Sequence, residues 1–422
     1  MIKKSLIALS GMFLVSFLNY LFHLMISRTL SVADYGDVAI LISVLAIVYM
    51  PFGGILTTLS RRIAKLNHQN KINEIFGLVK HYSKKLSKWV ILISIVMFTV
   101  FTAAHLITPY SKLFIGLQIV SLAMPVSVLI SVIKGYLQGK EEITKLMLIS
   151  IAEPVIKIAF TLLLVIQFNL GFFGATIALI ASGIILSISI APIVLKKTKE
   201  ATGDHKMDLG AIPIILTNLM ITSILYMDIF FVKLFVGAEG AGYYNVAGIT
   251  AKLLYFAAGA IILVLLPMSS KLDAGSDKKE IMMLLLKGTG FLTLGLIAGL
   301  LFSGWFIPLF FSAKYLASVQ PFMFLIVGMY FLGISTMIFN ILWSQHMEKK
   351  VLMIAAIVLP VQILLLSYFV PANNIVGAAI AIMITCAILL AVSLSVFLLV
   401  LNQKKIVMHE LNTFEKEMQY AT

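Results

Sequence analysis

The chain has 422 residues, of which 61% are hydrophobic and 12% are charged, and its formal net charge is +14. A soluble domain carries roughly 25% charged residues and 45–50% apolar ones, so the composition excludes a water-soluble fold. A positive charge of this size suggests nucleic acid as the partner of a soluble protein. Here the charges fall in short segments between long apolar runs, which excludes a nucleic-acid-binding protein and predicts lipid as the solvent.

Apolar runs of about 20 residues cross a bilayer as helices, and we identify twelve of them. The first run follows Met-Ile-Lys-Lys and is too long for the core of a cleaved signal peptide, so we expect it to remain as a span. The predicted spans are residues 6–27, 38–60, 89–108, 113–137, 146–167, 172–195, 211–236, 243–267, 288–311, 319–343, 351–370 and 375–401. Connections on one side are very short, such as Pro371–Asn374, whereas those on the other side are longer and basic.

The distribution of basic residues predicts the orientation. Of the 32 Lys and Arg residues, 25 lie on the side that holds both ends of the chain, and only Arg28, Lys112 and Lys314 lie in the outer connections. Cytoplasmic loops of membrane proteins carry an excess of Lys and Arg. Both ends are therefore predicted to be cytoplasmic.

The second half of the sequence repeats motifs of the first half in the same order. Three pairs of segments correspond: residues 33–39 with 241–247, Glu153–Val155 with Leu359–Val361, and Gly174–Ala178 with Gly377–Ala381. Each half holds an even number of predicted spans, so the two halves insert with the same orientation, as in a parallel repeat. We predict an all-α membrane protein of two six-helix bundles, residues 1–200 and 201–422, with the basic segment Lys196–Lys206 as linker.

Motifs for enzymatic chemistry are not found in the sequence. There is no Gly-x-x-x-x-Gly-Lys-Ser/Thr loop for nucleotides, no His/Cys set with metal-ligand spacing, and no long polar loop on the outer face. The single cysteine, Cys386, lies in an apolar run and can form no internal disulfide. These features favour a transporter over an enzyme, with no cofactor and no metal.

Ionisable residues inside spans are the candidate functional residues, because each costs about 2.5–3.5 kcal/mol at the bilayer centre and should face a cavity or a partner. Glu153 and Lys157 are spaced i,i+4 on one face of the fifth span. They are interpreted either as a cavity-lining pair that handles substrate or ions, or as a structural ion pair between helices. Lys134 and Lys233 lie near span ends, and we expect them to snorkel to the interface.

Two further intramembrane charges lie in the second half. Lys252 lies near the centre of the eighth span and is a candidate ligand for an anionic headgroup, with a structural pair as the alternative. Asp228, in the seventh span, is its candidate acid partner or a cation-binding group. Arg28 ends the first span; arginine suits bidentate phosphate recognition, but anchoring at the interface is an equal alternative.

Several motifs resemble a known family. The segment Arg28-Thr-Leu-Ser-Val-Ala-Asp34-Tyr35-Gly36 resembles the Arg-x-Leu-x-x-x-Asp-Tyr-Gly signature of polysaccharide-biosynthesis flippases. Gly135-Tyr-Leu-Gln-Gly139 is similar to their Gly-x-x-Gln-Gly segment, and residues 228–252 resemble their hallmark at the seventh and eighth spans. These flippases are the Wzx-type members of the MOP superfamily.

The resemblance implies a MATE-like fold with two six-helix bundles around a central cavity. It implies an isoprenoid-diphosphate-linked oligosaccharide as substrate, moved from the inner to the outer leaflet of the plasma (inner) membrane by alternating access, with a proton or sodium ion as the coupling ion. Membrane lipid and proteins of glycan polymerisation and assembly are the further expected partners. Carried over onto this chain, the candidates are Arg28, Lys252 and Asp228, joined by Glu153 and Lys157.

Other classes remain open. A MATE-type exporter of cationic drugs would share the fold, but it would favour an acid-rich cavity, whereas here the cations Lys157 and Lys252 match the acids Glu153 and Asp228. A membrane enzyme or scaffold of the same pathway would need a polar catalytic loop. A sugar–proton symporter of the major facilitator type would need an Asp-Arg-x-Gly-Arg-Arg type loop between the second and third spans, and the sequence has none there.

Overall fold

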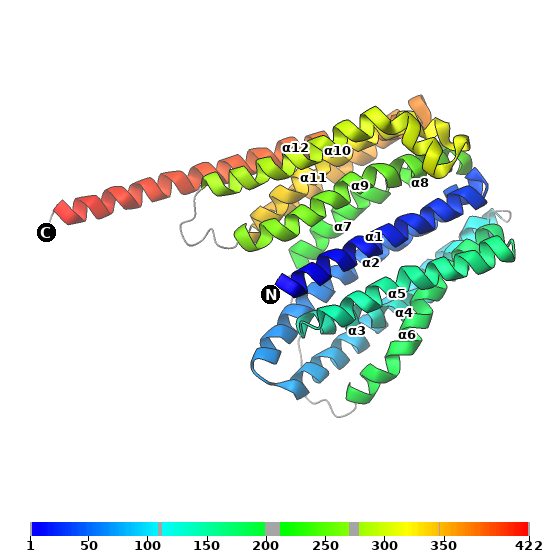
Figure 1. Ribbon diagram of the computed structural model, residues 1–422, viewed down its shortest axis with the longest axis horizontal. Coiled ribbons are helices and arrows are strands. Elements are labelled where there is room, and N and C mark those ends of the chain that lie inside the picture. The colour runs from blue at the N-terminus through cyan, green and yellow to red at the C-terminus, as the bar shows by residue number, and fades with distance from the viewer. Residues whose placement is uncertain (1, 109–111, 199–211, 270–277, 346, 421–422) are drawn as a thin grey trace. The chain divides into compact units, whose positions relative to one another are not determined.

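The computed structural model describes residues 2–108, 112–198, 212–269, 278–345 and 347–420. Within these ranges helices are the only regular secondary structure (Figure 1). Residues 199–206 of the predicted linker and residues 109–111 of an outer connection lie outside them. The helices are α1 (Ile2–Thr29), α2 (Val32–His68), α3 (Ile72–Ile107), α4 (Lys112–Gly139), α5 (Ile143–Thr161), the π-helical η1 (Leu162–Gln167), α6 (Gly171–Thr198), α7 (Ile212–Tyr226), α8 (Asp228–Phe235), α9 (Ala238–Ser269), α10 (Lys278–Phe311), the 3₁₀-helical η4 (Ala313–Ser318), α11 (Val319–Ser344) and α12 (Glu348–Tyr420).

The surface of these helices is apolar over long stretches. On α3, Leu106 and Ile107 are 76% and 81% exposed, and other large apolar side chains of the same helix, such as Ile95 at 58%, are exposed as well. Soluble monomers rarely expose contiguous apolar patches of this kind. Nine helices among the described residues are long and apolar enough to cross a membrane, or ten if the bent pair in α4 counts as one span. The all-helical membrane fold is confirmed, whereas the count of twelve spans stays a prediction.

Two helices are interrupted within their apolar length. α4 bends by 41° between residues 126 and 128, next to Pro125, which cannot donate a helical hydrogen bond. α12 has non-helical angles at Asn373 and Asn374. Its apolar part has 53 residues, about 80 Å at 1.5 Å per residue, whereas a bilayer core is about 30 Å thick. The break lies in the connection Pro371–Asn374 that the sequence predicts between two spans.

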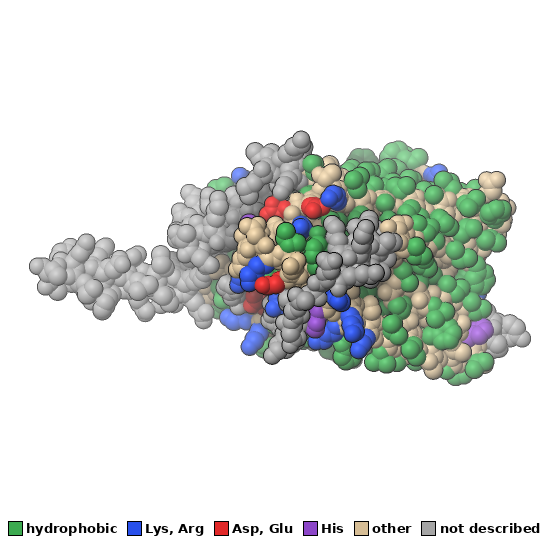
Figure 2. Space-filling model, turned by 90° about the horizontal axis from the view of Figure 1, so that it is seen from below, with side chains coloured by type: hydrophobic (Ala, Val, Ile, Leu, Met, Phe, Trp, Pro, Cys, Tyr) green, Lys and Arg blue, Asp and Glu red, His purple; other side chains and the backbone are tan. Residues whose placement is uncertain are grey.

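The basic segment between the second and third predicted spans is helical on both sides of a short turn. α2 continues to His68, and α3 begins at Ile72, with Asn70 in the left-handed region at a φ of 56°. Figure 2 shows most of the visible Lys and Arg side chains gathered in one region, whereas hydrophobic side chains dominate the described surface to the right of it. The visible charge is therefore concentrated away from the apolar surface.

The chain divides into two compact units. Residues 1–246 and 308–315 form the first unit, and residues 247–307 and 316–422 form the second. In the first unit α1 packs on α5, and α4 packs on α2, α3 and α6; in the second unit α11 packs on α12. The division into bundles at residue 200 that the sequence predicts stays a prediction.

Inside the first unit, the start of α2 crosses the start of α9 with backbones in contact. A Cβ atom on Gly36 would overlap the carbonyl oxygen of Ala238, and a Cβ atom on Gly242 would overlap the carbonyl oxygen of Val32. These two glycines belong to the segments 33–39 and 241–247 that correspond in sequence. The two copies of the repeated segment therefore lie against each other, each contributing the glycine that the crossing needs.

Candidate functional site

A cavity of about 260 Å³ lies between α1, α4 and α5 in the first unit. Its lining is mixed: apolar side chains alternate with two serines, an asparagine and one acid–base pair. The lining residues are Met12, Val15, Ser16, Asn19, Lys134, Met147, Ser150, Glu153 and Pro154. We call this cavity the α1–α5 pocket. Its charged groups lie on helices that we treat as spanning the membrane, where uncompensated charge is costly.

Lys134 and Glu153 are the charged pair of the α1–α5 pocket. The Nζ atom of Lys134 lies 2.9 Å from a carboxylate oxygen of Glu153, and the two side chains are 22% and 42% exposed. The pair joins α4 to α5. The expectation that Lys134 snorkels to the interface is therefore wrong, because a carboxylate on the neighbouring helix is within reach. Glu153 forms its ion pair across helices and not along α5.

Two glycines of α4 explain why Lys134 lies beside α5. A Cβ atom on Gly139 would lie 2.6 Å from the carbonyl oxygen of Ser60, and one on Gly135 would lie 3.2 Å from that of Leu56. Residues four apart share a helix face, so these glycines form the face of α4 that packs on α2. Lys134, one position earlier, lies on an adjacent face. The Gly-x-x-Gln-Gly segment thus sets the rotation of α4 and the direction of its lysine.

Lys157 lies one helical turn beyond Glu153 on α5, about 6 Å along the axis, and contacts α1. Its ammonium group donates a hydrogen bond to Oδ1 of Asn19 and lies 4.6 Å from the ring centre of Phe22. The Nδ2 group of Asn19 donates to the carbonyl oxygen of Val15 at 2.9 Å, which orients the amide oxygen towards Lys157. Two ammonium groups therefore lie within about one helical turn of the single carboxylate of Glu153.

Pro154 adds a polar group to the pocket wall. Proline has no N–H group, so it removes the donor that would normally bind the carbonyl oxygen of Ser150, four residues earlier. Ser150 lines the α1–α5 pocket together with Pro154. The pocket thus offers a backbone acceptor and hydroxyl groups beside Lys134, with Lys157 next to its lining residue Asn19, a set that suits a ligand with both anionic and hydroxyl groups.

Arg28 lies at the opposite end of α1 and caps another helix. Its Nε atom donates to the carbonyl oxygen of Phe310 at 2.8 Å, and Nη2 donates to that of Leu309 at 2.6 Å. These carbonyls end α10 and lack partners within their own helix, so a forked cation satisfies both and complements the helix dipole. In the same segment, the Tyr315 hydroxyl donates to the carbonyl oxygen of Ser27 at 3.0 Å.

Asp228 and Lys252 are both buried but belong to different units. Asp228 begins α8 in the first unit, and its carboxylate accepts hydrogen bonds from the Tyr244 hydroxyl at 2.6 Å and from the backbone N–H of Ile229 at 2.9 Å. Lys252 lies on α9 in the second unit, where its side chain is 8% exposed. The roles of both residues stay predictions.

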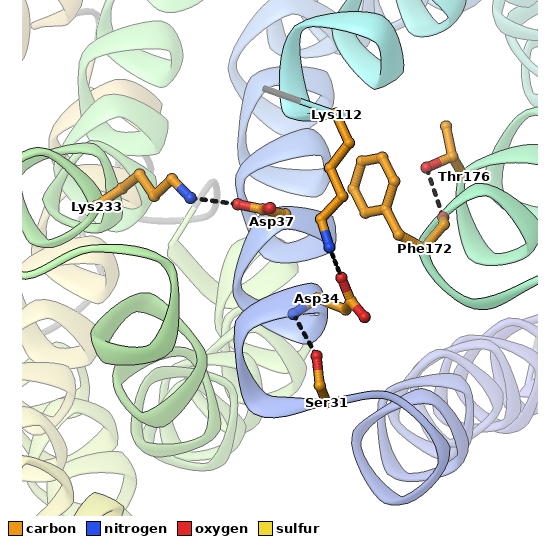
Figure 3. A network of polar contacts seen from close by, with 7 residues as sticks. All are labelled: Ser31, Asp34, Asp37, Lys112, Phe172, Thr176 and Lys233. Carbon is orange, nitrogen blue, oxygen red and sulfur yellow. Dashed lines mark hydrogen bonds and ion pairs between the residues drawn. The ribbon is translucent and has the colours of Figure 1, made fainter. Parts of the chain in front are cut away.

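A second cluster of charges lies at the start of α2. Figure 3 shows Asp34 and Asp37 reaching lysines on two different helices, Lys112 at the start of α4 and Lys233 on α8. Lys233 lies 2.5 Å from Asp37 and, contrary to the expectation that it snorkels, is held by this acid. The Ser31 hydroxyl accepts the backbone N–H of Asp34 at 3.0 Å and caps α2. Every charge of this cluster is paired, so it holds helices together.

Sequence reasoning located Glu153 and Lys157 but missed the partners that complete the site, Lys134 and Asn19. The signals for Lys134 were its charge near the end of a span and its position next to the glycine motif at residues 135–139. For Asn19, the signal was an amide in an otherwise apolar first span. Among the described residues no group of three or more His, Cys, Asp or Glu side chains is placed to hold a metal ion.

Comparison with solved structures identifies the fold. The chain resembles an inward-facing multidrug resistance MATE family transporter of the MOP superfamily with a TM-score of 0.71 at 14% identity, covering 91% of this chain and 93% of that one. It resembles the lipid II flippase MurJ in an inward closed conformation with a TM-score of 0.69 at 16% identity, covering 93% and 87%. A MOP superfamily transporter from Pyrococcus furiosus gives a TM-score of 0.65 at 15% identity, covering 94% and 93%. The chain shares its fold with these multi-pass membrane proteins.

The family follows from the sequence. The family model described as polysaccharide biosynthesis protein matches residues 1–273, more than half of the chain. The chain belongs to this family, and the resemblance inferred from its motifs is confirmed. No curated protein matches the sequence.

Proposed function

We propose that the protein is a flippase that moves an isoprenoid-diphosphate-linked oligosaccharide from the inner to the outer leaflet for surface polysaccharide assembly. The observation that carries the proposal is the α1–α5 pocket, which places Lys134 beside hydroxyl and amide groups on membrane helices, with Lys157 bonded to its lining residue Asn19. Family membership supports the polysaccharide pathway, and the fold supports transport. A diphosphate and a sugar match the cationic and hydroxyl-binding parts of such a pocket.

The need for such a protein follows from the properties of the substrate. A charged, hydrated headgroup does not cross about 30 Å of hydrocarbon unaided, whereas its isoprenoid tail is soluble there. A polar pocket between lipid-facing helices can shelter the headgroup while the tail remains in the bilayer. We infer alternating access as the mode of movement and no covalent chemistry, so the protein is not proposed as an enzyme.

The proposed architecture has twelve crossings with both ends in the cytoplasm of a cell whose plasma (inner) membrane holds the protein. α4 and α9 each cross once, and α12 crosses twice, with the break at Asn373–Asn374 between the crossings. The crossings form two six-helix bundles, residues 1–200 and 201–422. Arg28 and Lys252 are proposed as further contacts for the anionic headgroup, and Glu153 and Asp228 as residues that respond to a coupling ion.

The proposal is tested by measuring lipid-linked oligosaccharide in cells in which the gene is deleted. Wild type should clear the accumulated precursor, whereas Lys134→Ala and Lys157→Ala should clear it at least about tenfold more slowly, because each loses a charge-assisted contact of about 1.5–3 kcal/mol. Lys71→Ala is the matched control: its ion pair with Glu74 has side chains that are 50% and 43% exposed. The control should clear precursor at the wild-type rate.

The outcomes separate the candidate functions. If both lysine variants clear precursor at the wild-type rate and are present in the membrane in equal amounts, Lys134 and Lys157 have structural roles only. Absence of precursor accumulation, together with sensitivity to cationic drugs, would replace the flippase proposal with a MATE-type cation-coupled multidrug exporter. Lys252→Ala, measured in the same assay, tests the second unit independently.

A further inference from the structure

The α1–α5 pocket contains an anion of its own. A carboxylate oxygen of Glu153 forms an ion pair with the Nζ atom of Lys134 at 2.9 Å, and both side chains line the same cavity. An anionic headgroup that enters this pocket must therefore compete with a carboxylate that is covalently part of the wall. The competition decides how much of the cationic charge a ligand can use.

The charges of the site set the size of this effect. Lys134 in the pocket wall and Lys157, which is bonded to the lining residue Asn19, supply two positive charges, and Glu153 removes one, so the pocket and its immediate surroundings carry a net charge of +1 while the carboxylate is ionised. A diphosphate that bridges a lipid and a sugar keeps two negative charges near neutral pH. The two negative charges of the diphosphate are balanced only after the Glu153 carboxylate becomes neutral. Negative phosphate oxygens close to this carboxylate raise the energy of its ionised form and so favour its protonation.

Among the described residues that line the pocket, Lys134 is the one cation beside Glu153. α1 contributes Ser16 and Asn19, which do not titrate, and α4 contributes Lys134. α5 itself contributes Ser150 and Lys157. α6, which also packs on α5, has no charged residue or histidine before Lys196. A carboxylate displaced from Lys134 would stand beside phosphate oxygens in a membrane environment, where unpaired charge is costly.

We infer that Glu153 is a resident counter-ion that the substrate replaces, and that its carboxylate takes up one proton as the anionic headgroup binds. This inference rests on the proposed function for the nature of the anion. The step conserves charge and atoms: the Lys134 ammonium moves its hydrogen bond from Glu153 to a phosphate oxygen, and the freed carboxylate becomes a neutral carboxylic acid. Lys134 in the pocket and Lys157 behind Asn19 then stand against two negative charges.

The inference predicts how binding depends on pH. The complex holds one more proton than the empty protein, so affinity rises as pH falls, by up to about tenfold per pH unit for one linked proton. Glu153→Gln fixes the neutral state of the side chain and removes the competing anion. This variant should bind more tightly than wild type at the alkaline end, with an affinity that does not change with pH.

The experiment is isothermal titration calorimetry of the full-length protein in lipid nanodiscs. The probe is a short-chain prenyl diphosphate that carries one sugar, because both of its phosphates keep their charge between about pH 6 and pH 8. Titration in two buffers of different ionisation enthalpy counts the protons taken up, with about one expected for wild type and none for Glu153→Gln. Glu142→Gln is the matched control, since Glu142 pairs with Lys145 at 2.6 Å outside the pocket.

Each result bears on one hypothesis. Binding by wild type without proton uptake overturns the role of Glu153 and leaves the flippase proposal intact. A Glu153→Gln variant that keeps the wild-type dependence on pH also overturns it. If that variant does not fold, the number of protons that wild type takes up on binding still tests the role of Glu153. Failure of wild type to bind the probe contradicts the proposed function itself.

Discussion

Asp37 is the most enclosed acid among the described ion pairs, with a side chain that is 6% exposed against 27% for its partner Lys233. Removing one member of such a pair leaves the other charge without compensation in a poorly solvated place. We expect Asp37→Ala to lower the free energy of unfolding by about 3 kcal/mol. Thermal unfolding of the purified protein in detergent measures the loss.

Two comparisons make this prediction specific. The double variant Asp37→Ala/Lys233→Met should recover part of the stability, because no unpaired charge is left. Glu74→Ala breaks the exposed pair with Lys71 and should change stability by less than about 1 kcal/mol. If Asp37→Ala lowers the free energy of unfolding by no more than Glu74→Ala does, the buried pair stabilises the protein no more than the exposed pair.

At this scale the sequence could identify charged residues but not their partners. The spacing of Glu153 and Lys157 places both on one face of a helix, and this much holds. The partners, however, are chosen by tertiary packing: Lys134 on α4 reaches Glu153, and Asn19 on α1 reaches Lys157. The periodicity of residues along one helix does not show how a neighbouring helix is rotated about its axis. The partners in this part of the site could therefore not be predicted from the sequence.

Among the helices, α2 and α9 cross with their backbones in contact. Gly36→Ala would place a methyl group on the carbonyl oxygen of Ala238, and the backbones must separate to accept it. We expect a loss of about 1–3 kcal/mol or more from overpacking, although alanine favours a helix by about 1 kcal/mol over glycine. The yield of monodisperse protein and its melting temperature measure the change.

The matched control for this crossing is Gly248→Ala on α9. No atom lies within 4 Å of a Cβ built there, so only the gain in helix propensity remains. This variant should be as stable as wild type or slightly more stable. Equal effects at residues 36 and 248 would contradict the close crossing.

Helix positions were largely accessible from the sequence, but helix ends were not. The break in α12 falls at Asn373–Asn374, inside the connection that short polar residues predicted. By contrast, α2 runs for 37 residues and α3 for 36, well beyond their predicted spans. Hydropathy marks only the part of a helix that lies in lipid, whereas a helix continues into water as long as its backbone bonds and local packing support it.

At the scale of the whole molecule, the orientation in the membrane is the main open prediction. Cys386 is the only cysteine of the chain and is buried, so Cys386→Ser gives a background for single-cysteine labelling. A membrane-impermeant maleimide should label Asn169→Cys and Asn373→Cys from outside intact cells. Gln69→Cys, in the turn between α2 and α3, should react only after the cells are made permeable.

The three labelling positions are exposed in the structure, so differences in reactivity report the side of the membrane. Reaction of Gln69→Cys in intact cells would reverse the orientation inferred from the basic residues. Reaction of Asn169→Cys but not Asn373→Cys would show that α12 does not cross twice. The distribution of Lys and Arg residues predicts the orientation from the sequence. The association of residues 308–315 with the first unit was not predicted, because it depends on a contact between segments far apart in the chain.

That contact has a consequence for how the protein is made. Arg28 and the carbonyl oxygens that it caps are 281 and 282 residues apart in the chain. At about 5–20 residues per second, the ribosome delivers Leu309 and Phe310 roughly 15–55 s after Arg28. During that time α1 has been synthesised, but the partner of Arg28 at its C-terminal end has not. Nascent chains that end before residue 309 therefore carry an unfinished first unit, and they are the expected substrates of membrane quality control.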